Sequence, residues 1–116
     1  MQLNKLQAFI FWAAILMVLL LSLMPLSVPQ LSVFHWQDKV LHFVSYGVLC
    51  FLAIKVYGDR LALWKIAIAL AFFGLGIEIA QSFTEYRLGE VNDLLANILG
   101  ILAVIFFQVL LRKIYE

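Results

Sequence analysis

The chain has 116 residues, of which 66% are hydrophobic and only 13% charged, and its mean hydropathy is +1.05. This composition is too apolar for a water-soluble domain of such length and is typical of a chain that lies in a membrane. The net charge of +1, spread over short connecting segments, argues against a nucleic-acid partner.

Four apolar stretches follow one another along the chain, and each is close to the length of about 20 residues that a membrane-spanning helix needs. They cover residues 6–24, 40–56, 61–80 and 94–111. Because every backbone polar group must be satisfied inside lipid, long apolar runs cross a membrane as helices. The sequence therefore predicts an all-α integral membrane protein, with residues 1–116 forming one compact bundle of four transmembrane helices.

The first stretch has an alternative interpretation as a secretory signal, since Lys5 precedes an apolar run. That run is longer than the roughly 7 to 15 residues of a signal core, and the following MPLSVPQLS contains no Ala-x-Ala type cleavage site. A retained helix is the better interpretation. Cys50 is the single cysteine, so the chain cannot form an internal disulfide.

The lysines and arginines predict how the bundle is oriented, because cytoplasmic flanks are enriched in them. With both termini inside, six of the eight lie at inner helix ends, and only Lys39 and Arg87 lie outside. The six are Lys5, Lys55, Arg60, Lys65, Arg112 and Lys113. We therefore expect a multi-pass protein of the plasma (inner) membrane with cytoplasmic N- and C-termini.

Polar side chains concentrate at the expected outer end of the last three spans. They form three sets, each on one face of one helix: Asp38, His42 and Tyr46 in the second span, Glu78 and Gln81 in the third, and Asp93, Asn97 and Gly100 in the fourth. Ionisable groups within a membrane usually face the bundle interior, because exposure to lipid at mid-depth costs about 2.5–3.5 kcal/mol. We expect the three sets to surround one pocket just beneath the outer head groups.

Each of these residues also has an ordinary structural interpretation. Asp38 and Asp93 stand at natural N-cap positions, where a carboxylate accepts hydrogen bonds from unpaired backbone N–H groups. His42 could be a hydrogen-bonded structural residue, and Gly74 and Gly100 are small residues that let helices approach. Taken singly, none of them is specific for a functional site.

One ordered set of residues runs through most of the chain. DKVLHFVSY carries Asp38, Lys39, His42 and Tyr46, GLGIEIAQ carries Glu78 and Gln81, and Arg87, Asp93, Asn97 and Gly100 follow. In this order and spacing the chain resembles the VanZ-like membrane proteins. The resemblance implies an envelope protein associated with resistance to teicoplanin, a glycopeptide that targets cell-wall precursors outside the membrane, and it implies no settled reaction.

The leading hypothesis is an enzyme-like site that acts at the outer leaflet on a lipid-linked or anionic envelope molecule. Glu78, Asp93 and His42 are candidates for acid, base or nucleophile, with Glu78, nearest the apolar interior, best suited to proton transfer. Six further residues are candidates for binding the substrate or its phosphate: Asp38, Lys39, Tyr46, Gln81, Arg87 and Asn97. The N-termini of the second and fourth spans would assist, because their free N–H groups attract anions.

Two carboxylates of the second and fourth spans, with Glu78, could instead share a divalent cation with the substrate. Asp38, Asp93 and Glu78 offer hard oxygen ligands that suit Mg²⁺ or Mn²⁺, although no metal-ligand spacing here is diagnostic. Whether the protein uses a metal at all therefore stays open.

Two other classes of function fit the same residues. One is a non-enzymatic protein that binds a membrane lipid or antibiotic, or that supports an assembly in the envelope. The other is a small proton-coupled exporter, which should carry its carboxylate near the midplane, where both sides can reach it. Glu78 lies near one end of its span.

Overall fold

Four long helices make up the protein in its computed structural model, which describes residues 2–23, 35–83 and 91–115, with the side chains of residues 2, 3, 35–38 and 91 left outside that description. The helices are α1 (Gln2–Leu23), α2 (His35–Tyr57), α3 (Leu63–Ser82) and α4 (Val91–Tyr115). Each contains a stretch long and apolar enough to cross a membrane. The predicted fold class, an all-α bundle of four transmembrane helices, is confirmed.

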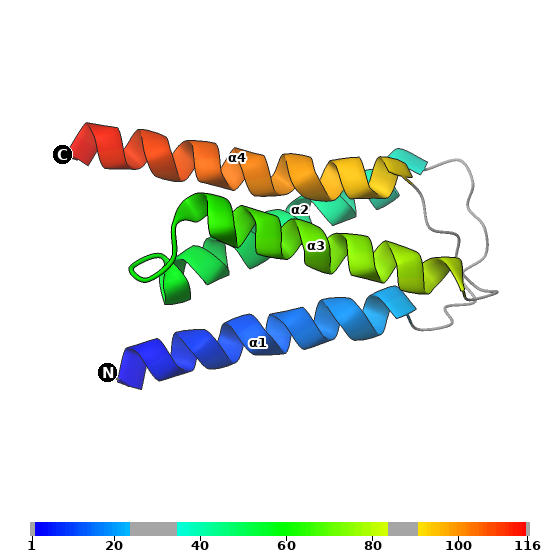
Figure 1. Cartoon of the computed structure of the whole chain (residues 1–116), viewed down its shortest axis with the longest axis horizontal. Helices are drawn as coiled ribbons and strands as arrows, with labels where there is room; N and C mark the ends of the chain where they lie inside the picture. Colours follow the sequence, from blue (N-terminus) through cyan, green and yellow to red (C-terminus); the bar gives the residue numbers. More distant parts are fainter. Residues whose placement is uncertain (1, 24–34, 84–90, 116) are drawn as a thin grey trace.

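The helices alternate in direction, so the two chain termini lie at the same end of the bundle (Figure 1). We call this the terminal end, and it also holds the turn between α2 and α3, residues 58–62. The opposite end, which we call the distal end, holds the ends of α1 and α3 and the starts of α2 and α4. As a result α2 and α4 run in the same direction, and residues near their starts lie at similar depth.

The core is built around α2, whose buried side chains recur every three or four residues. Tyr46, Leu49, Cys50 and Ala53 are each at most 3% exposed. This helical periodicity places them on one face, toward the other helices. The intervening apolar side chains, such as Phe51, are exposed on the bundle surface, as expected where the surrounding solvent is lipid.

Small residues bring α2 and α4 together at one close crossing. A Cβ atom at Gly47 would lie 3.5 Å from the carbonyl oxygen of Gly100. A Cβ atom at Gly100 would collide with the carbonyl oxygen of Phe43 and lie 3.2 Å from the backbone nitrogen of Gly47. Glycine at position 100 therefore allows the two backbones to approach, and polar side chains one turn away on each helix can meet.

Helix α1 lies at the side of the bundle and packs more lightly. Among residues 4–23, Phe11 is its one buried side chain, with ring contacts to Tyr57 at 6.0 Å. The neighbouring Trp12 Nε1–H donates a hydrogen bond of 2.9 Å to the Tyr57 hydroxyl. Within the described residues α1 contacts α2 and α3 and not α4.

Candidate functional site

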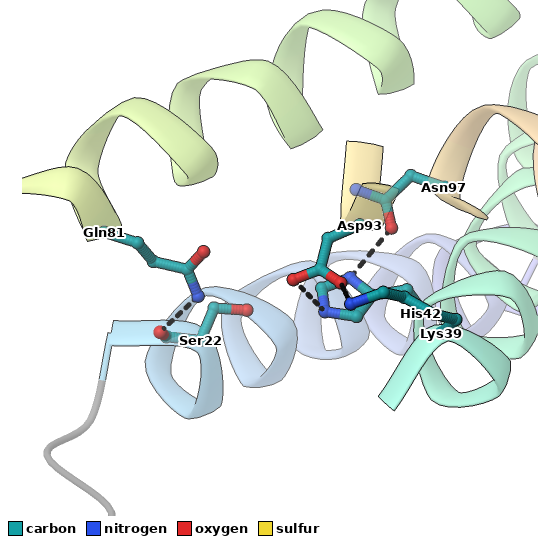
Figure 2. Close-up of polar contacts among 6 residues, drawn as sticks. All are labelled: Ser22, Lys39, His42, Gln81, Asp93 and Asn97. Atoms are coloured by element: carbon teal, nitrogen blue, oxygen red, sulfur yellow. Dashed lines mark hydrogen bonds and ion pairs between the residues drawn. The ribbon is translucent and has the colours of Figure 1, made fainter. Parts of the chain in front are cut away.

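Four polar side chains from α2 and α4 meet at the distal end of the bundle (Figure 2). The Lys39 ammonium donates to Asp93 Oδ1 at 2.6 Å. His42 Nδ1 lies 2.9 Å from Asn97 Oδ1, and His42 Nε2 lies 3.5 Å from Asp93 Oδ2. We call these residues, Lys39, His42, Asp93 and Asn97, the polar cluster.

Helix geometry explains why these four side chains meet. Lys39 and His42 are three residues apart on α2, and Asp93 and Asn97 are four residues apart on α4, so each pair lies on one helix face. The two helices begin at the same end, and the crossing at Gly100 holds them close together. The two polar faces therefore lie opposite each other at the same depth.

The two aspartates do not occupy the N-cap positions that the sequence suggested. Helix α4 begins at Val91 and α2 at His35, so Asp93 and Asp38 lie inside the first turn of their helices. Each helix extends beyond the apolar stretch into its polar flank. The Asp93 carboxylate consequently contacts side chains of α2.

Asp93 has the electrostatic environment of a buried ion pair. It is 5% exposed, whereas the Lys39 side chain is 25% exposed. Withdrawing a carboxylate from water is costly, and Lys39 together with the nearby His42 ring offsets this cost. The cluster therefore presents one buried carboxylate behind a cation that the surroundings can reach.

His42 is held by oxygen atoms on both sides of its ring. When Nδ1 carries the ring proton and donates to Asn97 Oδ1, the Nε2 lone pair points toward the Asp93 side of the cluster. Asn97, 1% exposed, orients the ring through this hydrogen bond from within the bundle.

Helix α3 adds a second polar group beside this cluster. Gly74 faces Asn97 and Tyr46, since a Cβ atom there would lie 2.9 Å from Asn97 Nδ2 and 3.3 Å from the Tyr46 ring. One helical turn further on, Glu78 is 8% exposed and interacts electrostatically with Tyr46. The buried carboxylate of α3 thus lies on the same side of the helix as the contact with α2 and α4.

Gln81 ties α3 to α1. It is 3% exposed, and its Nε2–H donates a hydrogen bond of 2.9 Å to the backbone carbonyl of Ser22 (Figure 2). The sequence placed Gln81 among the substrate-binding candidates but gave no indication of Ser22. A backbone carbonyl acceptor leaves no mark on residue identity, so no sequence signal could have revealed this contact.

Of the nine candidate site residues, seven have described side chains. Lys39, His42, Asp93 and Asn97 form the polar cluster, and Tyr46 packs beside it. Arg87 and the Asp38 side chain lie outside the described residues. Among the side chains that are described, no three His, Cys, Asp or Glu residues form a group that could hold a metal ion.

The fold and the polar cluster together define a class of protein. It is a multi-pass helical membrane protein with a buried, ion-paired polar group near the starts of α2 and α4. Residues 3–112 match the VanZ/LLP1 family, and the chain belongs to that family. The predicted family is therefore confirmed, and the protein is a VanZ-like membrane protein of the cell envelope.

One curated protein is similar to part of the chain. A Schizosaccharomyces pombe protein described as uncharacterized is 33% identical over 79 residues, which are 66% of this chain and 49% of that protein. The chain thus spans about half the length of this curated relative. No solved structure matches the chain.

Proposed function

We propose that the protein binds the anionic head group of a lipid-linked envelope molecule at the polar cluster and promotes a proton transfer on it. A polyprenyl phosphate, a cell-wall precursor or an anionic glycolipid has the required chemistry. In this proposal the distal end faces the outside of the plasma membrane and the two termini are cytoplasmic, in line with the distribution of lysine and arginine. A role in resistance to teicoplanin would follow if the bound molecule is the precursor that the drug targets.

The observation that carries the proposal is the contact of Asp93 with both Lys39 and His42. Lys39 is partly exposed and is held by a carboxylate, which has the charge and the hydrogen-bonding geometry of one edge of a phosphate. An incoming phosphate can therefore replace Asp93 at the ammonium group. The N-termini of α2 and α4, both at the distal end, add N–H groups that favour an anion there.

The same contact suggests how the bound molecule would be activated. Once Lys39 turns to the phosphate, Asp93 remains beside His42 Nε2. His42, with its ring held by Asn97, then accepts the proton of a hydroxyl group or of water as that oxygen forms a bond to the phosphate. The bond from phosphorus to the departing oxygen breaks, and the departing oxygen receives the proton back from His42. Glu78, buried on the adjacent face of α3, is the second group available for proton transfer.

Mass spectrometry of membrane lipids and wall precursors, in cells with and without the full chain, tests the proposal. We expect a covalent product that disappears with Asp93→Asn, His42→Gln or Glu78→Gln at normal protein levels. Asp59→Asn is the matched control, since Asp59 is an exposed carboxylate at the terminal end. A product that persists with both His42→Gln and Glu78→Gln would refute proton-transfer catalysis at this site.

A non-enzymatic binder is the second candidate, and the Lys39–Asp93 pair favours it. An ion pair that opens for an anion and closes afterwards suffices for reversible binding. In that case lipid and precursor chemistry is unchanged, and Lys39→Gln alters retention of an anionic lipid or antibiotic. The proton-coupled exporter is less well supported, because Glu78 lies only four residues before Ser82, the distal end of α3.

A further inference from the structure

A polar cleft lies at the terminal end, far along the bundle from the polar cluster. It has a volume of about 180 Å³, is open on one side, and is lined by residues of α2, the following turn and α4. Its polar and aromatic lining residues are Phe51, Lys55, Asp59, Gln108 and Arg112. We call it the terminal cleft. A closed cavity of roughly 150 Å³ accommodates a benzene ring, so a small head group fits here.

Gln108 is the feature that helix packing alone does not explain. It is the one polar side chain in α4 between Asn97 and Arg112. Along the helix it lies about 6 Å deeper in the bundle than Arg112. An amide at such depth is unfavourable unless it finds a hydrogen-bonding partner. Within the described part of the chain its side chain makes no hydrogen bond to the protein, so its donors and acceptor are available to a ligand.

Two cations line the cleft together with this amide, Lys55 from α2 and Arg112 from α4. Gln108 and Arg112 are four residues apart on α4, and Phe51 and Lys55 are four residues apart on α2, so each pair shares a face. The Lys55 ammonium lies 5.3 Å from the centre of the Phe51 ring. Arg112 has no ion pair among the described residues.

An ordinary role for the two cations is to complement the C-terminal dipoles of α2 and α4, where both lie in the last turn. That role requires neither a hollow between the helices nor an amide beneath it. Asp59, at the rim, leaves the cleft with two positive charges and one negative charge. The net positive charge of the cleft, the depth of Gln108 in the bundle and the Phe51 ring together favour a ligand that has a phosphate at one end and a hydrocarbon chain at the other.

We propose that the terminal cleft binds the head group of an anionic phospholipid from the adjacent leaflet. The phosphate lies between Lys55 and Arg112, whose guanidinium can donate two parallel hydrogen bonds to it. Gln108 donates to the ester oxygens below, and an acyl chain lies against Phe51. This site is independent of the polar cluster and of the function proposed for it.

Native mass spectrometry of the detergent-purified full chain, with phosphatidylglycerol or phosphatidylcholine added, tests the proposal. We expect phosphatidylglycerol to be retained roughly tenfold better than phosphatidylcholine, and Arg112→Gln to lower its retention by about tenfold. Lys113→Gln is the matched control, because it removes the same charge from the next residue, which does not line the cleft. We expect it to lower retention by about twofold at most.

Equal losses with Arg112→Gln and Lys113→Gln would show diffuse attraction to a basic surface and would overturn the proposal, as would equal retention of the two lipids. Gln108→Leu, compared with Val109→Leu on the same helix turn, provides a test that leaves every charge in place. We expect only Gln108→Leu to reduce retention of phosphatidylglycerol. Unchanged retention with Gln108→Leu would overturn the proposal even if Arg112→Gln failed to fold.

Discussion

Replacing Gly100 with alanine tests whether the α2–α4 crossing holds the bundle and its polar cluster together. The added Cβ would collide with the Phe43 carbonyl oxygen and would lie 3.0 Å from the Phe43 carbonyl carbon. Both are backbone atoms, so relief requires one whole helix to shift. Overpacking of this kind costs about 1–3 kcal/mol, which exceeds the gain of up to about 1 kcal/mol from alanine's higher helix propensity.

Two other glycines of the bundle provide the comparison. A Cβ at Gly76 would meet nothing within 4 Å, so Gly76→Ala should stabilise the protein by about 0.5–1 kcal/mol. A Cβ at Gly74 would press on the ends of the Asn97 and Tyr46 side chains, which can yield, so Gly74→Ala should fall between the other two. The free energy of unfolding, measured by denaturant titration in a fixed detergent and lipid mixture, should therefore rank Gly76→Ala, Gly74→Ala and Gly100→Ala in decreasing order. Equal stability of the Gly76 and Gly100 variants would refute the close crossing.

Three further predictions concern polar contacts, the first two measured by the same unfolding titration and the third by proteolysis. Asp93→Asn removes the buried carboxylate that accepts a hydrogen bond from the Lys39 ammonium and should destabilise the protein by about 1.5–3 kcal/mol, while Asp59→Asn at the exposed terminal end should change little; equal effects of the two would contradict this contact. Trp12→Phe removes the hydrogen bond between α1 and α2 and should cost about 0.5–1.5 kcal/mol. Gln81→Leu removes the hydrogen bond to the α1 backbone and should speed proteolysis within α1, and unaltered proteolysis would count against this contact.

Composition and periodicity are sufficient to predict the helices and the face on which each polar side chain lies. The 66% hydrophobic content requires helices in a membrane, and the four-residue spacing of Asp93 and Asn97 places them on one face. Periodicity within a helix does not determine which other helix that face meets. Gly100 contributes to that choice because the absence of a side chain allows α2 and α4 to cross closely. The sequence indicated that Gly100 lets a helix approach, but that this helix is α2 became apparent only with both backbones in place.

The contacts that individual side chains make were harder to predict than the helix face on which each side chain lies. The sequence suggested Lys39 as a phosphate ligand and Asp93 as an acid, base or nucleophile, or alternatively a helix cap, but it did not indicate the contact between the two that the structure shows. Such pairing depends on the relative depth of two helices, and one residue of shift along either helix would move the charges about 1.5 Å apart along its axis. The contact between Gln81 and the main-chain oxygen of Ser22 also depends on the relative depth of two helices, and the identity of the acceptor residue gives no sign of it.

The four helices differ in how firmly they are held, and this difference determines which helix can separate from the bundle most easily. Helices α2 and α4 meet through backbone contacts at Gly100, which leave no room for sliding. Helix α1 is held by one buried side chain among residues 4–23, by a hydrogen bond from Trp12 near its middle and by a hydrogen bond to Ser22 near its distal end. Regions with few buried contacts open at lower free energy than the core. Movement of α1 away from α3 would break the hydrogen bond between Gln81 and Ser22 and leave the ion pair between α2 and α4 intact, so α1 can separate with the least disruption of the fold.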